Sequence, residues 1–138
     1  MTATPANLLV PNSAGTGAPR GQMPANACDS HMHIFDPAFP RGEGSTGHGA
    51  TQATAADYQR LQRRLGLARA VVVTPRYYLT DNRVTLNAIQ ALGSDRTRGV
   101  AVVDHGITQE ELRALRDGGI MGVRYTTPHV TADHPVFQ

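Results

Sequence analysis

Hydrophobic and polar positions follow two alternating patterns along the chain. Short runs rich in β-branched residues are typical of strands, and apolar residues spaced three or four apart are typical of helices. The predicted strands are Ala27–Phe35, Ala70–Thr74, Gly99–Val103 and Met121–Tyr125. The stretches 54–66, 81–93 and 108–118 lie between them and have the helical spacing. The chain is therefore expected to alternate strand and helix from residue 27 to residue 125.

The predicted helices also have recognisable start and stop signals. Thr54 with Asp57, and Thr108 with Glu111, have the spacing of a capping box, in which each side chain bonds the other residue's backbone. Asp81 is the expected N-cap of the middle helix. Glycine stands at each expected helix end: Gly66, Gly93 and Gly118.

This order of elements predicts an α/β fold. Each helical segment is long enough for a right-handed crossover between parallel strands. Four such strands form either a small open sheet or the N-terminal half of a (β/α)8 TIM barrel. In both cases the functional edge lies at the C-terminal ends of the strands. The polar residues expected there are His31, His33, the 74–78 loop, Asp104, His105 and Arg124.

Composition bounds the organisation of the chain. Its 138 residues, with 40% hydrophobic and 17% charged, suit one globular domain. Residues 1–25 are rich in Ala, Pro and Gly and are expected to form a flexible N-terminal tail, with the domain at 26–138. We find no signal peptide and no apolar run that could span a membrane. With a single cysteine, Cys28, a cytoplasmic location is expected.

Charge argues against nucleic acid as a partner. The 13 basic residues are all arginine, and the formal net charge is only +2. Four arginines cluster near the first predicted helix, where a solvated helix face explains them: Arg60, Arg63, Arg64 and Arg69. No aromatic interleaving or recognition-helix pattern accompanies them. A small molecule is the expected partner.

The candidate chemistry is concentrated in the first strand. Asp29, His31 and His33 are two residues apart, so an extended strand would point all three to one face. Imidazoles at this spacing, roughly 7 Å along the backbone, can converge on one metal or substrate atom. The alternative is a surface strand with two solvated histidines. The glycine-rich loop 41–52 matches a dinucleotide fingerprint as a string, but two prolines separate it from the strand, so we expect a rim or mobile lid.

Four landmarks in chain order resemble one family: Asp29–Pro37, Thr80–Asn82, Gly99–Asp104 and Gly122–Tyr125. They are similar to the amidohydrolase-related branch of the amidohydrolase superfamily, in particular to its 2-pyrone-4,6-dicarboxylate lactonase and sugar-lactone hydrolase and isomerase group. The resemblance covers about residues 25–126. It implies a (β/α)8 TIM barrel with the active site at the C-terminal rim.

The resemblance also implies roles for individual residues. His31 and His33 would be catalytic; in metal-using relatives they bind one divalent metal such as zinc, whereas other lactonases of the group use none. Arg124 matches an arginine that grips a substrate carboxylate, a task suited to a planar guanidinium. Arg76 stands where relatives often have a small hydroxyl residue near the substrate. This difference leaves the identity of the substrate open. Tyr78 is a substrate-binding candidate or, like Tyr77, ordinary packing.

The expected function is hydrolysis of a carboxylated lactone, with or without a metal. A zinc-dependent decarboxylase of the same fold is one alternative, and a non-catalytic half-barrel that needs a partner is another. The family's later histidine, its strand-eight aspartate and a second arginine after strand four have no counterpart here. We therefore expect an N-terminal half, truncated after the fourth strand, inactive as this fragment, and either oligomeric or complemented by a C-terminal half.

Overall fold

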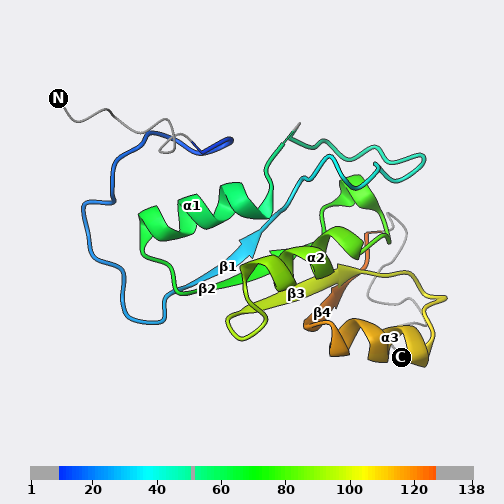
Figure 1. Ribbon diagram of the computed structural model, residues 1–138. Coiled ribbons are helices and arrows are strands. Elements are labelled where there is room, and N and C mark those ends of the chain that lie inside the picture. The colour runs from blue at the N-terminus through cyan, green and yellow to red at the C-terminus, as the bar shows by residue number, and fades with distance from the viewer. Residues whose placement is uncertain (1–9, 51, 127–138) are drawn as a thin grey trace.

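Four parallel strands form one sheet in the order of the chain (Figure 1). The computed structural model of the protein describes residues 10–50 and 52–126. Its elements are β1 (Cys28–Met32), α1 (Ala55–Leu65), β2 (Arg69–Val73), the 3-10 turn η2 (Arg76–Tyr78), α2 (Arg83–Leu92), β3 (Thr97–Val102), α3 (Gln109–Asp117) and β4 (Ile120–Arg124). The predicted α/β fold is confirmed, and the topology is that of the first four strands of a (β/α)8 barrel.

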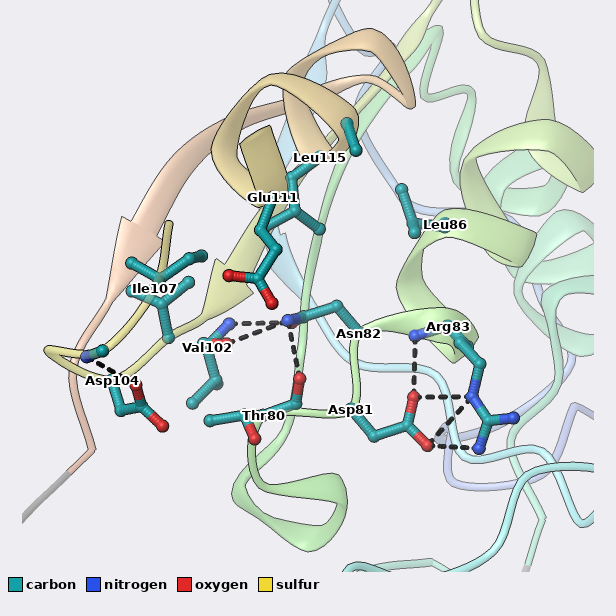
Figure 2. Close-up of a pocket in the computed structure, with 13 residues that line it drawn as sticks. Thr80, Asp81, Asn82, Arg83, Leu86, Val102, Asp104, Ile107, Glu111 and Leu115 are labelled. Carbon is teal, nitrogen blue, oxygen red and sulfur yellow. Dashed lines mark hydrogen bonds and ion pairs between the residues drawn. The ribbon is translucent and has the colours of Figure 1, made fainter. Parts of the chain in front are cut away.

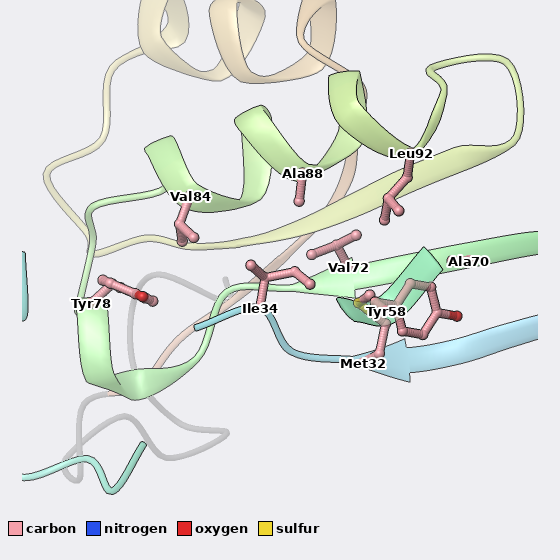
Figure 3. Close-up of a cluster of buried hydrophobic side chains, with 9 residues drawn as sticks. All are labelled: Met32, Ile34, Tyr58, Ala70, Val72, Tyr78, Val84, Ala88 and Leu92. Carbon is pink, nitrogen blue, oxygen red and sulfur yellow. The ribbon is translucent and has the colours of Figure 1, made fainter. Parts of the chain in front are cut away.

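The three helices pack on one face of the sheet, called the outer face here. One cluster joins β1 and β2 to α1 and α2 through Met32, Val72 and Tyr58 (Figure 3). A second joins α2 to β3 and β4, with Ile89 and Ala101 both fully buried. The opposite side of the sheet, the inner face, is covered by none of these helices. The core therefore lies between the sheet and its helices.

The predicted capping boxes are present at α1 and α3, and Gly66 ends α1 in the left-handed conformation (φ 73°). The middle helix differs from the prediction. Its N-cap is Asn82 rather than Asp81, and the Asn82 side chain makes no capping bond. Asp81 takes over part of that task, because its Oδ1 accepts the Arg83 backbone N–H at 3.1 Å. The Asn82 amide is thereby free to point into the protein.

The first strand departs most from the prediction. It ends at Met32 rather than Phe35, because Phe35 instead forms an antiparallel bridge with Ala53. A β-bulge also lies inside it: Asp29 pairs with Ala70 and Met32 with Val72, so β1 has one extra residue. Because of the extra residue, side chains before the bulge no longer alternate between the two faces in step with those after it.

As a result, Asp29 does not share a face with the two histidines. Its Oδ2 accepts the Tyr58 hydroxyl of α1 at 3.1 Å, and its Oδ1 accepts the His31 backbone N–H at 3.1 Å. Desolvation and the neighbouring carboxylate raise the pKa of Tyr58, so the phenol keeps its proton and donates it to Asp29. Asp29 is a structural acid on the helix side of the sheet.

The segment before β1 has no helix or strand among its described residues, yet it contacts α1. Arg64 donates to the Gly15 carbonyl and to the Ser13 hydroxyl, and Asn12 donates to the Gln52 carbonyl. Residues 1–9 and 127–138 lie outside the described part. The flexible tail at 1–25 and the domain limits stay predictions. Within the described part, every helix is too short or too polar to cross a membrane.

Candidate functional site

His31 and His33 lie on the inner face, at the C-terminal end of β1. Met32 and Ile34 alternate with them and are buried on the outer face, which directs both imidazoles the other way. The ring centroids are 5.0 Å apart and the rings are nearly perpendicular, at 81°. Both side chains are exposed in this chain. The bulge therefore leaves the histidine pair intact while it removes Asp29 from it.

The backbone of β2 holds the ring of His33. Its Nδ1 lies 2.7 Å from the carbonyl oxygen of Val73, the last residue of that strand. A carbonyl only accepts, so Nδ1 carries the proton of the neutral ring. The lone pair of Nε2 is then left free for a ligand. This is the arrangement by which a second contact orients a histidine that binds a metal or accepts a proton.

Electrostatics favour the neutral form of His33. Partial burial lowers its pKa below 6.5, the nearby charges of His31 and Arg124 lower it further, and the bond to Val73 opposes them. At neutral pH the ring is uncharged, with the Nε2 lone pair available. Arg124 therefore lies within electrostatic range of His33.

Arg124 reaches this region from the far edge of the sheet. It is the last residue of β4 and pairs in register with Val102 of β3, on the face opposite Ala101 and Val103. Its side chain is half-buried. The structure thus brings His31, His33 and Arg124 to one face, while their roles in substrate binding and catalysis stay predictions.

Arg76 and Tyr78 lie in η2, the turn that follows β2, and differ in their surroundings. Arg76 is exposed. Tyr78 is 2% exposed and packs in the core cluster of Figure 3. Its hydroxyl accepts the Asp36 N–H at 3.0 Å and donates to the Asp36 carbonyl at 3.3 Å. The proposal that Tyr78 contacts substrate is therefore corrected: the turn directs this ring into the core, and packing is its role.

An aromatic wall borders the histidine pair. The Phe35 ring centroid lies 6.3 Å from that of His33 and 5.7 Å from that of Tyr77. The guanidinium of Arg41 lies over the Tyr77 ring, 5.5 Å from its centroid, an attractive cation–π geometry. Sequence reasoning missed Phe35 and Arg41, because only the docked loop brings Arg41 next to Tyr77.

The glycine-rich loop is seated on η2 as a rim. The Gly42 N–H donates to the Tyr77 carbonyl at 3.0 Å, and the Ser45 hydroxyl donates to the Arg76 carbonyl at 2.9 Å. A Cβ atom at Gly47 would lie 2.7 Å from the Tyr77 nitrogen, and one at Gly49 would lie 2.7 Å from the rings of Phe35 and Tyr77. These two glycines allow close packing.

The described residues supply an incomplete metal site. Zinc in proteins takes three or four nitrogen, sulfur or oxygen ligands, and His31 and His33 provide two nitrogens. Within residues 10–50 and 52–126, no group of three His, Cys, Asp or Glu side chains is placed to hold a metal ion. The donor type fits zinc, but the number of ligands within this part of the chain does not.

A separate hollow of about 560 Å³ lies between α2 and α3 (Figure 2). Its lining is mixed, and neither histidine of the pair contributes: Thr80, Asp81, Asn82, Arg83, Leu86, Val102, Val103, Asp104, Gly106, Ile107, Glu111, Ala114 and Leu115. Asp81 is paired with Arg83, and Asp104 accepts the Gly106 N–H. The expected candidate Asp104 is thus an exposed loop carboxylate that caps its own turn.

Comparison with known proteins shows the family and the fold to which this chain is similar. The family model described as Amidohydrolase matches residues 28–136. The chain is 36% identical over 114 residues to 2-pyrone-4,6-dicarboxylate hydrolase of Comamonas testosteroni, covering 81% of this chain and 37% of that protein. It is 34% identical to 4-sulfomuconolactone hydrolase of Rhizobium radiobacter (75% and 34% covered) and 30% identical to D-galactarolactone isomerase of Agrobacterium fabrum (84% and 39% covered).

A solved structure has the same arrangement of elements. It is a probable 2-pyrone-4,6-dicarboxylic acid hydrolase from Acinetobacter baumannii with citric acid bound, with a TM-score of 0.70 and 31% identity. The match covers 81% of this chain and 43% of that structure. The chain thus spans between a third and a half of the length of these relatives. On the strength of the family match and the shared fold, the chain belongs to the amidohydrolase family.

Proposed function

We propose that this chain forms part of a hydrolase that opens a lactone bearing a carboxylate group. The observation that carries the proposal is the histidine pair on the same face as Arg124. Two of the relatives are named as hydrolases, of a pyrone dicarboxylate and of a sulfomuconolactone, and a third as a lactone isomerase. Arg124 would bind the carboxylate with its two parallel N–H donors. Exposed Arg76 is a second candidate for an anionic group.

The two histidines have different tasks in this proposal. The neutral His33 ring has its proton on Nδ1, so its Nε2 can accept a hydrogen bond from water or bind a metal, but cannot donate. His31 has no such bond from its ring among the described residues and is the better donor to the lactone carbonyl oxygen. A donor at that oxygen stabilises the negative charge that develops when the ring opens.

Water activation needs a further group. The carboxylate nearest in sequence to the pair, Asp29, is turned to Tyr58 on the outer face. We therefore propose that a general base comes from outside the described residues, from another part of the natural protein or from a complementing half. If that base lies in a complementing half, the 138-residue chain is expected to be inactive by itself. If a metal takes part, His31 and His33 would bind it, and it would polarise the carbonyl or the water.

The test is a pH-stat assay of the natural gene product against matched lactones with and without a carboxylate. His31→Ala should lower kcat about 10²-fold or more. Arg124→Ala should raise KM for the carboxylated lactone and leave the uncharged lactone unchanged, whereas exposed Arg113→Ala on α3 should change neither. Absence of turnover across the panel, or equal effects of Arg124→Ala and Arg113→Ala, would overturn the proposal.

A further inference from the structure

Three buried polar side chains meet at the C-terminal ends of β2 and β3. Thr74 and Thr85 are 0% exposed and Asn82 is 8% exposed; together they are called the Asn82 cluster. Thr74 Oγ1 donates to Asn82 Oδ1 at 2.8 Å and lies 2.6 Å from Thr85 Oγ1. Since the single Thr74 proton is used toward Asn82, Thr85 is the donor in the second bond. The hydrogen bonds of the cluster therefore run in one direction, from Thr85 of α2 through Thr74 to Asn82.

The Asn82 amide serves as a strand partner for Val102. Its Oδ1 accepts the Val102 N–H at 2.8 Å, and its Nδ2 donates to the Val102 carbonyl at 2.9 Å and to the Thr80 carbonyl at 3.0 Å (Figure 2). With the Thr74 bond, all four hydrogen-bonding positions of the amide are used. Strand β2 ends at Val73 and cannot reach Val102, so one side chain bonds both groups of that residue.

Both ends of the cluster adjoin backbone that holds a proposed functional side chain. Thr74 follows Val73, whose carbonyl bonds His33 Nδ1 at 2.7 Å. Val102 pairs in register with Arg124, and the next residue donates its N–H to the Arg124 carbonyl at 3.1 Å. A continuous route of bonded contacts therefore joins His33 to Arg124 through Thr74, Asn82 and Val102.

We propose that Asn82, with Thr74 and Thr85, is a positioning residue that sets the orientation of the His33 ring relative to Arg124. Its catalytic consequence rests on the proposed lactone hydrolysis, but its structural consequence does not. An amide that only stabilised the fold would affect stability without affecting the two functional side chains. The positioning role predicts an additional, local effect on the His33 ring, which can be measured without any substrate.

The test compares buried threonines of equal exposure. Thr74→Val removes the bond to Asn82, whereas Thr97→Val, at the start of β3, removes a fully buried hydroxyl that has no hydrogen-bond partner among the described residues. Thr74→Ser keeps the hydroxyl and should restore the parent behaviour. Asn82→Asp keeps the shape of the amide but loses both donors to the Thr80 and Val102 carbonyls.

The first readout is NMR of the chain with ¹⁵N-labelled histidine. We expect Thr74→Val and Asn82→Asp to shift the His33 Nδ1 resonance, and Thr97→Val to leave it unchanged. The second readout is kinetic and uses the natural gene product: the cluster variants should lower kcat/KM for the carboxylated lactone by about tenfold to a hundredfold, as for a small misplacement of catalytic groups. Thr74→Ser should keep most of the wild-type kcat/KM.

The outcomes separate the two proposals. If the wild-type natural gene product has no lactonase activity but the His33 signals still move only in the cluster variants, positioning holds and the function fails. If the His33 signals are the same in folded Thr74→Val and Thr97→Val, the positioning proposal is wrong whatever the activity. If Asn82→Asp does not fold, Thr85→Val is the second test variant. It removes the hydrogen bond from Thr85 to Thr74 and should shift the His33 Nδ1 resonance in the same direction.

Discussion

The two faces of this sheet are built from alternate residues of the same strands, yet they differ in almost every physical respect. On the outer face Val72 and Ala101 are fully buried beneath the helices, and Ile89 of α2 packs in the same core. On the inner face His31 and His33 are exposed and polar. Both described core clusters therefore lie on the outer face, whereas the candidate chemistry lies on the inner face beside the buried Val73 and Val102. Substitutions on the two faces should have separable effects.

The largest separation is expected for Ile89→Ala. This side chain is 0% exposed and packs between α2, β3 and β4, so its truncation should cost about 2–5 kcal/mol of unfolding free energy. The exposed His31→Ala should change it by less than about 0.5 kcal/mol. Urea unfolding followed by circular dichroism measures both. Equal losses would show that the inner face also carries the fold.

A smaller effect is expected at the helix N-caps. Thr54→Ala and Thr108→Ala each remove a capping box, at a typical cost of about 1 kcal/mol. Asp57, the partner of Thr54, is 4% exposed, whereas Glu111, the partner of Thr108, is exposed. The loss should be greater at Thr54, because the buried Asp57 carboxylate loses the Thr54 hydroxyl donor where water cannot easily replace it. The same urea titration measures both variants, and a greater loss at Thr108 would contradict this reasoning.

A smaller effect still is expected from the titration of His33. Its pKa in the folded chain lies below the ordinary 6.5, so the unfolded chain binds the proton more readily. The stabilising contribution is fully present above pH 6.5 and is lost as the pH falls from 6.5 through the folded pKa. Histidine NMR should show His33 titrating below 6.5 with Nδ1 protonated. A midpoint above 6.5 would show that the Val73 bond outweighs burial.

The smallest expected effect is that of a chelator. Two imidazole ligands are too few for tight zinc binding, so the 138-residue chain should retain no stoichiometric zinc after dialysis against a mild chelator, and its melting temperature should not change. Atomic absorption and a thermal melt measure this. Zinc that survived dialysis would mean that residues outside the described part complete the site.

The order of strands and helices could be predicted because each element carries its own local signal. Thr54, Thr108 and Gly66 lie at helix ends as expected. The positions of His31, His33 and Arg124 on one face followed from strand alternation and the resemblance. These inferences need only neighbours in the sequence and a parallel sheet.

What could not be predicted depends on contacts between distant segments. The bulge that turns Asp29 to the helices arises from pairing of β1 with β2, and no residue type in β1 marks it. The burial of Tyr78 depends on contacts with distant segments, including a hydrogen bond to Asp36, 42 positions earlier. The Thr80–Asn82 landmark is visible in the sequence, but the bonds from Asn82 to Val102 form only once β3 is in place.

The glycine-rich rim has a practical consequence for redesign of substrate preference. Gly47 packs on the backbone of η2, and Gly49 packs on two aromatic rings. A Cβ atom added at either glycine would lie closer to these groups than real Cβ atoms do. In a library that randomised the whole loop, most variants would thus carry a side chain at Gly47 or Gly49 and would not form the rim. Glu43, Thr46 and His48 are exposed and alternate with fixed points of the rim, so diversity confined to these three positions should survive folding and vary the surface at the rim.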